Sequence, residues 1–175
     1  GGASIFCAII KETNAMPSPS KPPSAEKELQ RLEALCARSE QCESEILGKL
    51  RRRGLCASDA ARVLESLKSR RFVDNARYAS AFVRDKYRFM RWGRRKIAYA
   101  LSAKGVSQAD IEAAMDEIDA DEYRTILAGL ISARARVMGD EAYTYEGRTR
   151  LFRMAASRGY EADEIAAMVK KFTSK

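Results

Sequence analysis

The sequence predicts an all-α protein that is an elongated, curved tandem repeat of three three-helix modules. Two observations lead to this prediction. First, the chain of 175 residues is rich in Ala, Leu, Arg, Glu and Lys and holds only 10 glycines and 4 prolines, a composition that favours helix over sheet. Second, one pattern of apolar residues and glycines recurs three times, which is typical of stacked helical units.

The first 23 residues stand apart from this pattern. The stretch MPSPSKPPS holds all four prolines of the chain, and this composition predicts a disordered tether. The short apolar patch Ile5–Ile10 lacks both the basic flank and the cleavage site of a signal peptide. We therefore expect a disordered leader or tether over residues 1–23, with 1–15 a leader or upstream extension and Met16 the natural start.

The repeat consists of three segments that begin at Cys42, Gly93 and Gly147, with offsets of 51 and 54 residues. Each segment has the pattern of a helix, a glycine turn and a second helix. The glycines fall where a helix C-terminus favours a residue in the left-handed conformation, and an apolar residue follows each one. In this register the coinciding positions are Ile46, Ile97 and Leu151; Leu50, Leu101 and Ala155; Gly54, Gly105 and Gly159; Leu55, Val106 and Tyr160; Leu64, Met115 and Val169.

A further helical pattern precedes each segment and completes a three-helix module. In the third module this pattern includes Leu127, Leu130 and Val137. We expect modules over residues 24–71, 72–119 and 120–175. Each would bury only a small core, so neighbouring modules must stack on one another to be stable.

Local signals mark where several helices begin. Asp74 is a predicted N-cap, and its neighbours Val73 and Tyr78 have the spacing of a hydrophobic staple. This helix should turn Tyr78, Phe82 and either Tyr87 or Met90 to the core and end around 91–92. Later in the same module, Ser107 and Asp110 have the spacing of a capping box. The equivalent residues Cys56 and Glu161 predict weaker caps in the other two modules.

The charge predicts an anionic partner, because the formal net charge is +8 and the pI is about 9.5. The chain has no histidine, which removes the commonest general base and metal ligand. We expect no enzymatic activity, no cofactor and no metal. The cysteines show no metal-binding spacing and are expected to be reduced thiols: Cys7, Cys36, Cys42 and Cys56. No apolar run is long enough to span a membrane, and a soluble, cytoplasmic protein is expected.

The densest basic run covers residues 84–96, where seven cations face only Asp85. Helix-dipole complementation accounts for cations at a helix C-terminus, but not for Arg94, Arg95 and Lys96 at the start of the next helix. We interpret the run as a binding surface. Trp92 within it has two readings, a packing residue or a stacking contact to the partner. In the third module, arginines recur on the middle helix, and Arg148 matches Arg94 in the repeat. This recurrence suggests a basic path along the stack, formed by Arg148, Arg150, Arg153 and Arg158.

These segments resemble the RecX family, bacterial regulatory proteins of the RecA recombinase. The resemblance rests on FVDNARYASAFV and WGRRKIAYALSAKGVSQADIEAAM in the second module, ARSEQCESEILGKLRRRG in the first and RLFRMAASRGYEADEI in the third, and it covers about residues 26–172. Three positions depart from the family pattern: Asn75 stands where Asp is usual, Cys42 where Ser is usual, and Ile46 where Leu is usual.

The resemblance implies a monomeric inhibitor that binds RecA, as monomer or filament on DNA, and dampens strand exchange, ATP hydrolysis and the SOS response. Nonspecific contact with single- or double-stranded DNA is also expected, and the alternative is a DNA-binding helical-repeat protein with no obligate protein partner. Sequence-specific reading by a helix-turn-helix is not expected, since Leu101 stands where that turn has a small residue. The predicted partner-binding residues are Arg84, Arg88, Arg91, Trp92, Arg94, Arg95, Lys96, Arg148 and Arg150.

Overall fold

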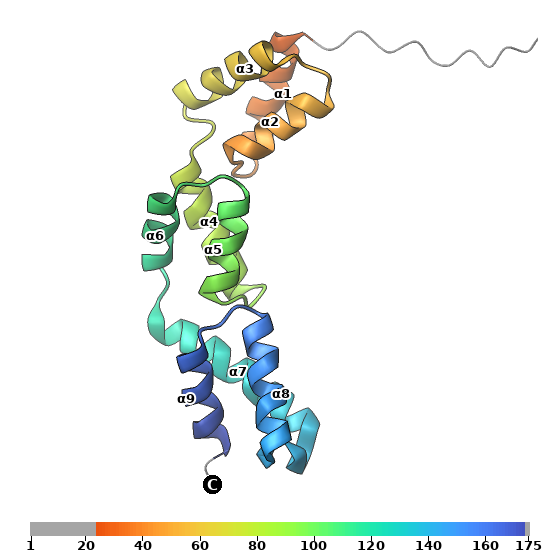
Figure 1. Cartoon of the computed structure of the whole chain (residues 1–175). Helices are drawn as coiled ribbons and strands as arrows, with labels where there is room; N and C mark the ends of the chain where they lie inside the picture. The colour runs from red at the N-terminus through yellow and green to blue at the C-terminus, as the bar shows by residue number, and fades with distance from the viewer. Residues whose placement is uncertain (1–23, 174–175) are drawn as a thin grey trace, which may run out of the picture.

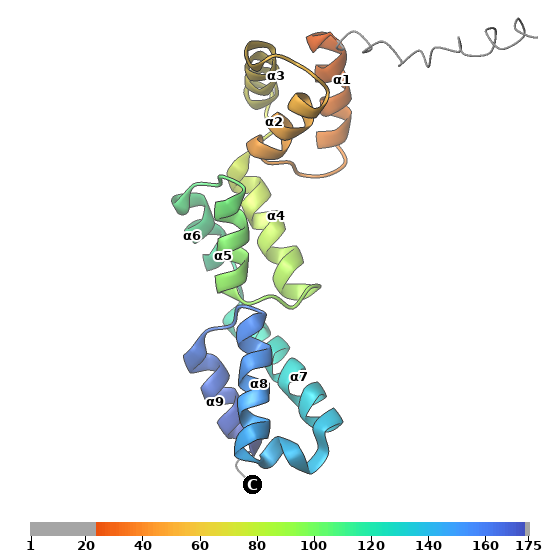
Figure 2. The same ribbon diagram turned by 45° about the vertical axis from the view of Figure 1, so that its right-hand side comes forward.

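The computed structural model describes residues 24–173, and within this range it is all-α and without strands, as the composition predicted. The helices form three consecutive groups that stack end to end into an elongated, curved molecule (Figure 1, Figure 2). The predicted leader over 1–23 lies outside the described residues. No helix in the described part of the chain is both long and apolar enough to cross a membrane.

The three groups are named here modules one, two and three. Module one comprises α1 (Ala25–Cys36), α2 (Glu43–Arg52) and α3 (Ala57–Ser69). Module two comprises α4 (Asn75–Arg88), α5 (Arg94–Ala103) and α6 (Gln108–Asp116). Module three comprises α7 (Ala120–Met138), the 3-10 turn η1 (Gly139–Tyr143), α8 (Tyr145–Ser157) and α9 (Ala162–Thr173).

The repeated glycines take the conformation that the repeat predicted. Gly54, Gly105 and Gly159 have φ values of 83°, 75° and 88°, and each lies directly after the C-cap of the middle helix of its module. Left-handed backbone of this kind is readily adopted only by glycine. The three turns therefore fix the same helix-turn-helix geometry in each module.

The predicted N-caps of the second module are also confirmed. The side chains of Asp74 and Ser107 accept hydrogen bonds from the backbone N–H groups of Arg77 and Asp110. Cys42, at the N-cap of α2, makes no such bond. Instead, the N–H of Glu43 donates to the Asn75 side chain of the next module at 3.1 Å, so Asn75, one of the departures from the RecX pattern, bonds to the residue that follows Cys42.

Of the two residues expected as alternatives in the core, Tyr87 is buried and Met90 is 50% exposed. Three other local expectations were wrong. Helix α4 ends at Arg88 rather than around 91–92. Val73 packs in the core of module one whereas Tyr78 packs in that of module two, so the two do not form a staple. Val137 is exposed, because Met138 occupies the core-facing position one helical repeat after Ile131.

The middle helix of module three begins earlier than its counterparts. Thr144 caps α8, three residues before Gly147, which is the position equivalent to the N-caps Cys42 and Gly93. Gly147 is buried inside the first turn, where an added Cβ would overlap the backbone of Glu141 in η1. The glycine permits this close approach of η1 to α8.

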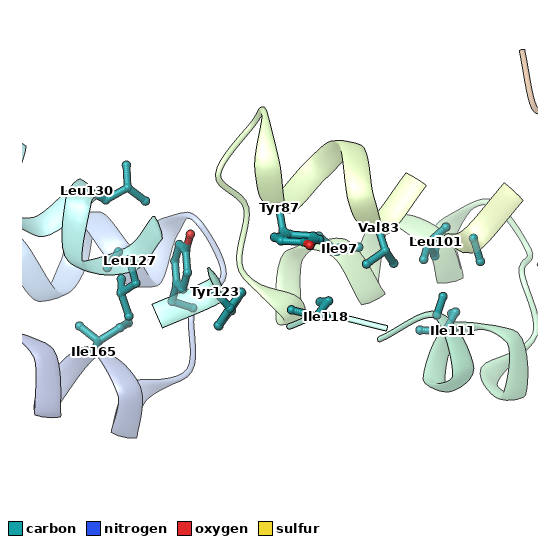
Figure 3. Packing of buried hydrophobic residues seen from close by; sticks show 14 of the residues in the cluster. Val83, Tyr87, Ile97, Leu101, Ile111, Ile118, Tyr123, Leu127, Leu130 and Ile165 are labelled. Atoms are coloured by element: carbon teal, nitrogen blue, oxygen red, sulfur yellow. The ribbon is translucent and has the colours of Figure 1, made fainter. Parts of the chain in front are cut away.

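The buried residues form two clusters. One belongs to module one, with Leu32, Ile46 and Leu67 fully buried. The other runs without a break through modules two and three (Figure 3), where Ile118 and Tyr123 lie between the cores of the two modules. Only Cys42 of module one belongs to this second cluster. Modules two and three therefore share a single core, while module one has its own.

Candidate partner-binding site

The predicted basic run lies at the junction of modules two and three, where the α4–α5 loop contacts the α8–α9 turn. The N–H of Gly93 donates to the carbonyl of Arg158 at 2.8 Å, and the N–H of Arg95 donates to that of Gly159 at 3.1 Å. A Cβ at Gly93 would overlap the backbone of Gly159 and Tyr160. The two segments are therefore in direct backbone contact, and α5 begins with its first turn against module three.

Two tyrosines form the buried part of this junction. The rings of Tyr123 and Tyr160 lie 5.1 Å apart. The Tyr123 hydroxyl accepts from the Arg94 N–H and donates to Glu161, both at 2.9 Å, and the Tyr160 hydroxyl donates to the Arg91 carbonyl at 3.3 Å. Burial raises the pKa of Tyr123 well above its usual range and that of Tyr160 to about 12. Both hydroxyls are neutral donors at physiological pH.

Two of the predicted contact residues are bound within the chain. The Arg94 guanidinium lies 4.0 Å from the centre of the Tyr123 ring and pairs with Glu161 and Glu164 at 3.7 and 3.9 Å. Arg88 donates three hydrogen bonds to the Glu122 carboxylate, and chiefly these bonds hold the pKa of Glu122 below its usual value. The structure thus gives both arginines a role in joining modules two and three.

Trp92 is half-buried and packs against the shared core. The ammonium groups of Lys86 and Lys96 lie 5.4 and 4.5 Å from its ring, distances at which a cation is attracted to an indole face. Of the two readings of Trp92, the structure thus supplies the packing contact. The ring also holds two lysines of the basic run in place.

The remaining arginines of the run face solvent. Arg84, Arg91 and Arg95 are exposed and form no ion pair with any residue between 24 and 173. Arg91 has a φ of 54°, a left-handed conformation that is uncommon for a non-glycine residue. Next to it, Phe89 is 77% exposed. Exposed arginines beside an exposed aromatic side chain are typical of contact surfaces.

The two module junctions differ in charge at equivalent positions. At the first junction, Glu45 of α2 forms an ion pair with Lys104 at the C-terminus of α5. The repeat places Lys96 and Arg158 at the equivalent positions of the second junction, and the backbone of Lys96 lies against Gly159. Where the first junction closes an ion pair, the second therefore carries two cations. We call Arg91, Arg95, Lys96 and Arg158 the basic junction.

The other two predicted contacts lie elsewhere on module three. Arg148 is exposed in a groove between α8 and α9, and Arg150 pairs with Glu141 of η1. The predicted set also omitted Phe89 and Arg158. Nothing in the sequence marks Phe89 as exposed, but Arg158 is in register with Lys104, and comparison of the two junctions along the repeat could have identified it.

The fold defines a helical-repeat protein, and exposed arginines lie at the junction of its modules two and three. A family model described as RecX, second three-helix domain, matches residues 74–115. The chain is 31% identical over 137 residues to the Regulatory protein RecX of Clostridium botulinum strain Eklund 17B, covering 77% of this chain and 63% of that protein. It is 32% identical over 149 residues to that of Mycobacterium sp. strain KMS, covering 82% and 81%.

Solved structures agree with these relatives in fold. A crystal structure of a regulatory protein RecX matches with a TM-score of 0.75 at 18% identity, over 85% of this chain and 72% of that one. RecX from Lactobacillus salivarius matches with a TM-score of 0.73 at 17% identity, over 85% and 96%. The chain belongs to the RecX family, a family of regulatory proteins and not of enzymes. It spans 63% of the length of its Clostridium botulinum relative.

Proposed function

We propose that this protein binds the RecA recombinase and its filament on DNA, and that it thereby dampens strand exchange, ATP hydrolysis and the SOS response. Membership of the RecX family supports the choice of partner. The choice of contact site rests on the basic junction. Two cations there occupy the positions whose equivalents form an ion pair at the first junction. Unpaired arginines around a module contact favour an anionic surface as ligand.

In this proposal the elongated stack lies along the partner, and the face with the basic junction makes the contact. Arg84, Arg91 and Arg95 meet acidic groups of RecA or phosphates of the bound strand. Phe89 adds apolar area beside them. Arg88 and Arg94 act indirectly, since their partners within the chain keep the α4–α5 loop against module three.

DNA-dependent ATP hydrolysis by RecA tests the function. The protein is added at amounts too small to coat the DNA, and the steady-state rate is measured. Inhibition under these conditions is expected, since a ligand of the filament acts without covering the strand. The absence of inhibition, together with tight binding to naked DNA that weakens steeply with salt, would instead identify an electrostatic DNA-binding protein.

The site is tested with a triple variant, Arg84→Ala, Arg91→Ala and Arg95→Ala. Its control is the triple variant Arg38→Ala, Arg51→Ala and Arg52→Ala, which removes the same charge from exposed positions of module one. The first variant should raise the half-inhibitory concentration about tenfold, because exposed charges steer association. An equal effect of both variants would show that net charge alone, and not the position of these three arginines, determines binding.

A further inference from the structure

A second basic surface lies between α7 and α8, away from the module junction for most of its length. It is a groove with a volume of about 550 Å³, which we call the arginine groove. Four arginines and four apolar residues line it: Leu130, Ala133, Arg134, Val137, Arg150, Arg153, Met154 and Arg158. No acidic residue is among them.

Most of this charge is unbalanced within the described part of the chain. Arg150 pairs with Glu141, whereas Arg134, Arg153 and Arg158 form no ion pair between residues 24 and 173. Arg158 is the C-cap of α8, where a cation complements the helix dipole. Arg153 lies in the middle of that helix, so the dipole does not account for it. Like charges around one groove cost stability, which favours a role in binding.

Apolar side chains also line the groove. Val137 is 78% exposed, although it lies one residue before the end of α7, a helix whose other large aliphatic residues are buried or half-buried. Met154 is half-buried beside it, and methionine adapts its shape readily to different partners. A lining of apolar side chains and arginines matches a ligand that carries both apolar and acidic groups.

The groove also connects with the basic junction. Arg158 belongs to both surfaces, and Arg91 and Arg158 both lie close enough to the Tyr160 hydroxyl to favour its ionised form. The cations therefore continue from the α4–α5 loop along α8. Of the arginines from which the sequence predicted a basic path, Arg150, Arg153 and Arg158 line this groove, whereas Arg148 lies in the groove between α8 and α9.

We propose that the arginine groove binds an acidic amphipathic segment of a partner protein, with an apolar side chain against Val137 and Met154 and carboxylates paired with Arg134, Arg153 and Arg158. Guanidinium groups bind carboxylates with two parallel hydrogen bonds. Nucleic acid fits less well, because no aromatic ring lines the groove to stack a base. This inference rests on the proposed function only for the identity of the partner.

Direct binding measurements test the proposal with the full chain and a labelled helical peptide. The peptide is rich in Glu and carries Leu at i, i+4 and i+7, the spacing of groove-binding helices. A second peptide replaces each Leu with Ser, and a single-stranded oligonucleotide of similar charge is the third probe. Fluorescence anisotropy gives the dissociation constant of each.

Two variants and two matched controls locate the binding site. Val137→Ser is compared with Tyr99→Ser, since both side chains are 78% exposed. Arg153→Glu is compared with Arg124→Glu, an equal change of charge at an exposed position of α7. The proposal predicts that Val137→Ser weakens binding of the Leu peptide about fivefold through lost apolar contact, and that Arg153→Glu weakens it about tenfold. The controls should change it less than about twofold.

Three outcomes would overturn the proposal: no binding of the Leu peptide, equal binding of the Ser peptide, or sensitivity to Arg153→Glu without sensitivity to Val137→Ser. The last outcome, with tighter oligonucleotide binding, would assign the groove to nucleic acid. Inhibition of RecA by the same variants separates the two proposals. If Val137→Ser inhibits normally and no peptide binds, only the groove proposal fails; if the peptide binds and the unmodified protein does not inhibit RecA, only the proposed function fails.

Discussion

Arg94 and Arg95 are neighbours in the sequence and equal in charge, yet they do different work. Arg94 stacks on Tyr123 and pairs with two glutamates of module three. Arg95 is exposed, and only its backbone N–H joins the junction. The difference arises because their side chains point in different directions from the first turn of α5. The charge of a residue in the sequence does not give this direction.

Substitution of these two residues should separate stability from binding. Arg94→Ala removes a half-buried stacking contact and an ion pair and should lower the free energy of unfolding by about 1–3 kcal/mol. Arg95→Ala should change it by less than about 0.5 kcal/mol while weakening inhibition of RecA. Urea denaturation measures the first effect. A larger stability loss in Arg95→Ala than in Arg94→Ala would contradict these assignments.

Glu28 is a carboxylate that is only 1% exposed. Burial by itself raises its pKa, but hydrogen bonds from Arg31 and Arg53 at 2.8 and 3.0 Å outweigh burial, and the pKa lies below its ordinary value of 4.5. A carboxyl group with a lowered pKa in the folded state stabilises the protein above its ordinary pKa. This stabilisation is lost as the pH falls from 4.5 through the pKa of the folded state.

The variant Glu28→Gln tests this dependence. At neutral pH it should lower the free energy of unfolding of module one by about 1–3 kcal/mol, because hydrogen bonds to a charged acceptor are lost. The difference from the unmodified protein should shrink as the pH is lowered below 4.5, since the native carboxylate then takes up a proton. Urea unfolding followed by circular dichroism at several pH values measures it. A difference that does not change with pH would refute the role of the charge.

At the scale of helices and turns, the repeated glycines have the same backbone conformation but different surroundings. Gly105 has open space where its Cβ would be, whereas a Cβ at Gly159 would overlap the backbone of Lys96 in α5. The first glycine ends a helix. The second also sets how closely modules two and three approach.

Alanine substitution should reveal this difference. Gly105→Ala should cost about 1–2 kcal/mol, the price of placing a Cβ in the left-handed region. Gly159→Ala should cost more, because the backbone of α5 must also move, and it should change the fluorescence of Trp92 at the junction. Thermal unfolding and the emission spectrum give both quantities. Equal costs for the two variants would show that the close approach is relaxed easily.

Much of this architecture could be predicted from the sequence, because glycine turns and N-caps are local signals. The register of the repeat located the turns at Gly54, Gly105 and Gly159, and Asp74 and Ser107 cap their helices as expected. Helix ends that depend on other modules were not predictable. Helix α4 ends early where its loop bonds to the α8–α9 turn.

The candidate site was likewise predictable only where it depends on local signals. Its location could be inferred because cations at the start of α5 have no explanation in the helix dipole. Which cations face solvent could not be inferred from the sequence. Arg88 and Arg94 are paired with glutamates about 34 to 70 residues further along the chain. Such pairings depend on how modules two and three stack.

At the scale of the whole molecule, the cores divide the chain unequally. Modules two and three share one cluster of buried residues, whereas module one has its own and meets module two mainly through polar contacts. These include the Tyr78 hydroxyl on Glu45 at 3.1 Å and the bond from the Glu43 N–H to Asn75. Polar contacts couple folding more weakly than a continuous apolar core.

Module one should therefore unfold separately. Trp92 is the only tryptophan, so its fluorescence reports on modules two and three while far-ultraviolet circular dichroism reports on all helices. Leu67→Ala should destabilise module one by about 2–5 kcal/mol and split the dichroism transition without moving the fluorescence midpoint. Leu127→Ala in the shared core should move the fluorescence midpoint. Identical shifts of both probes in both variants would show a single cooperative unit.

The shared core of modules two and three has a consequence for recognition. Because it joins the α4–α5 loop rigidly to α8, the distance between the two cationic surfaces is set by folding and not by the ligand. A partner whose anionic groups repeat at that distance gains the second contact at high effective concentration, while one with another spacing gains only the first. If both proposed surfaces bind, the protein should therefore favour an assembled lattice over its isolated building block without any contact unique to either.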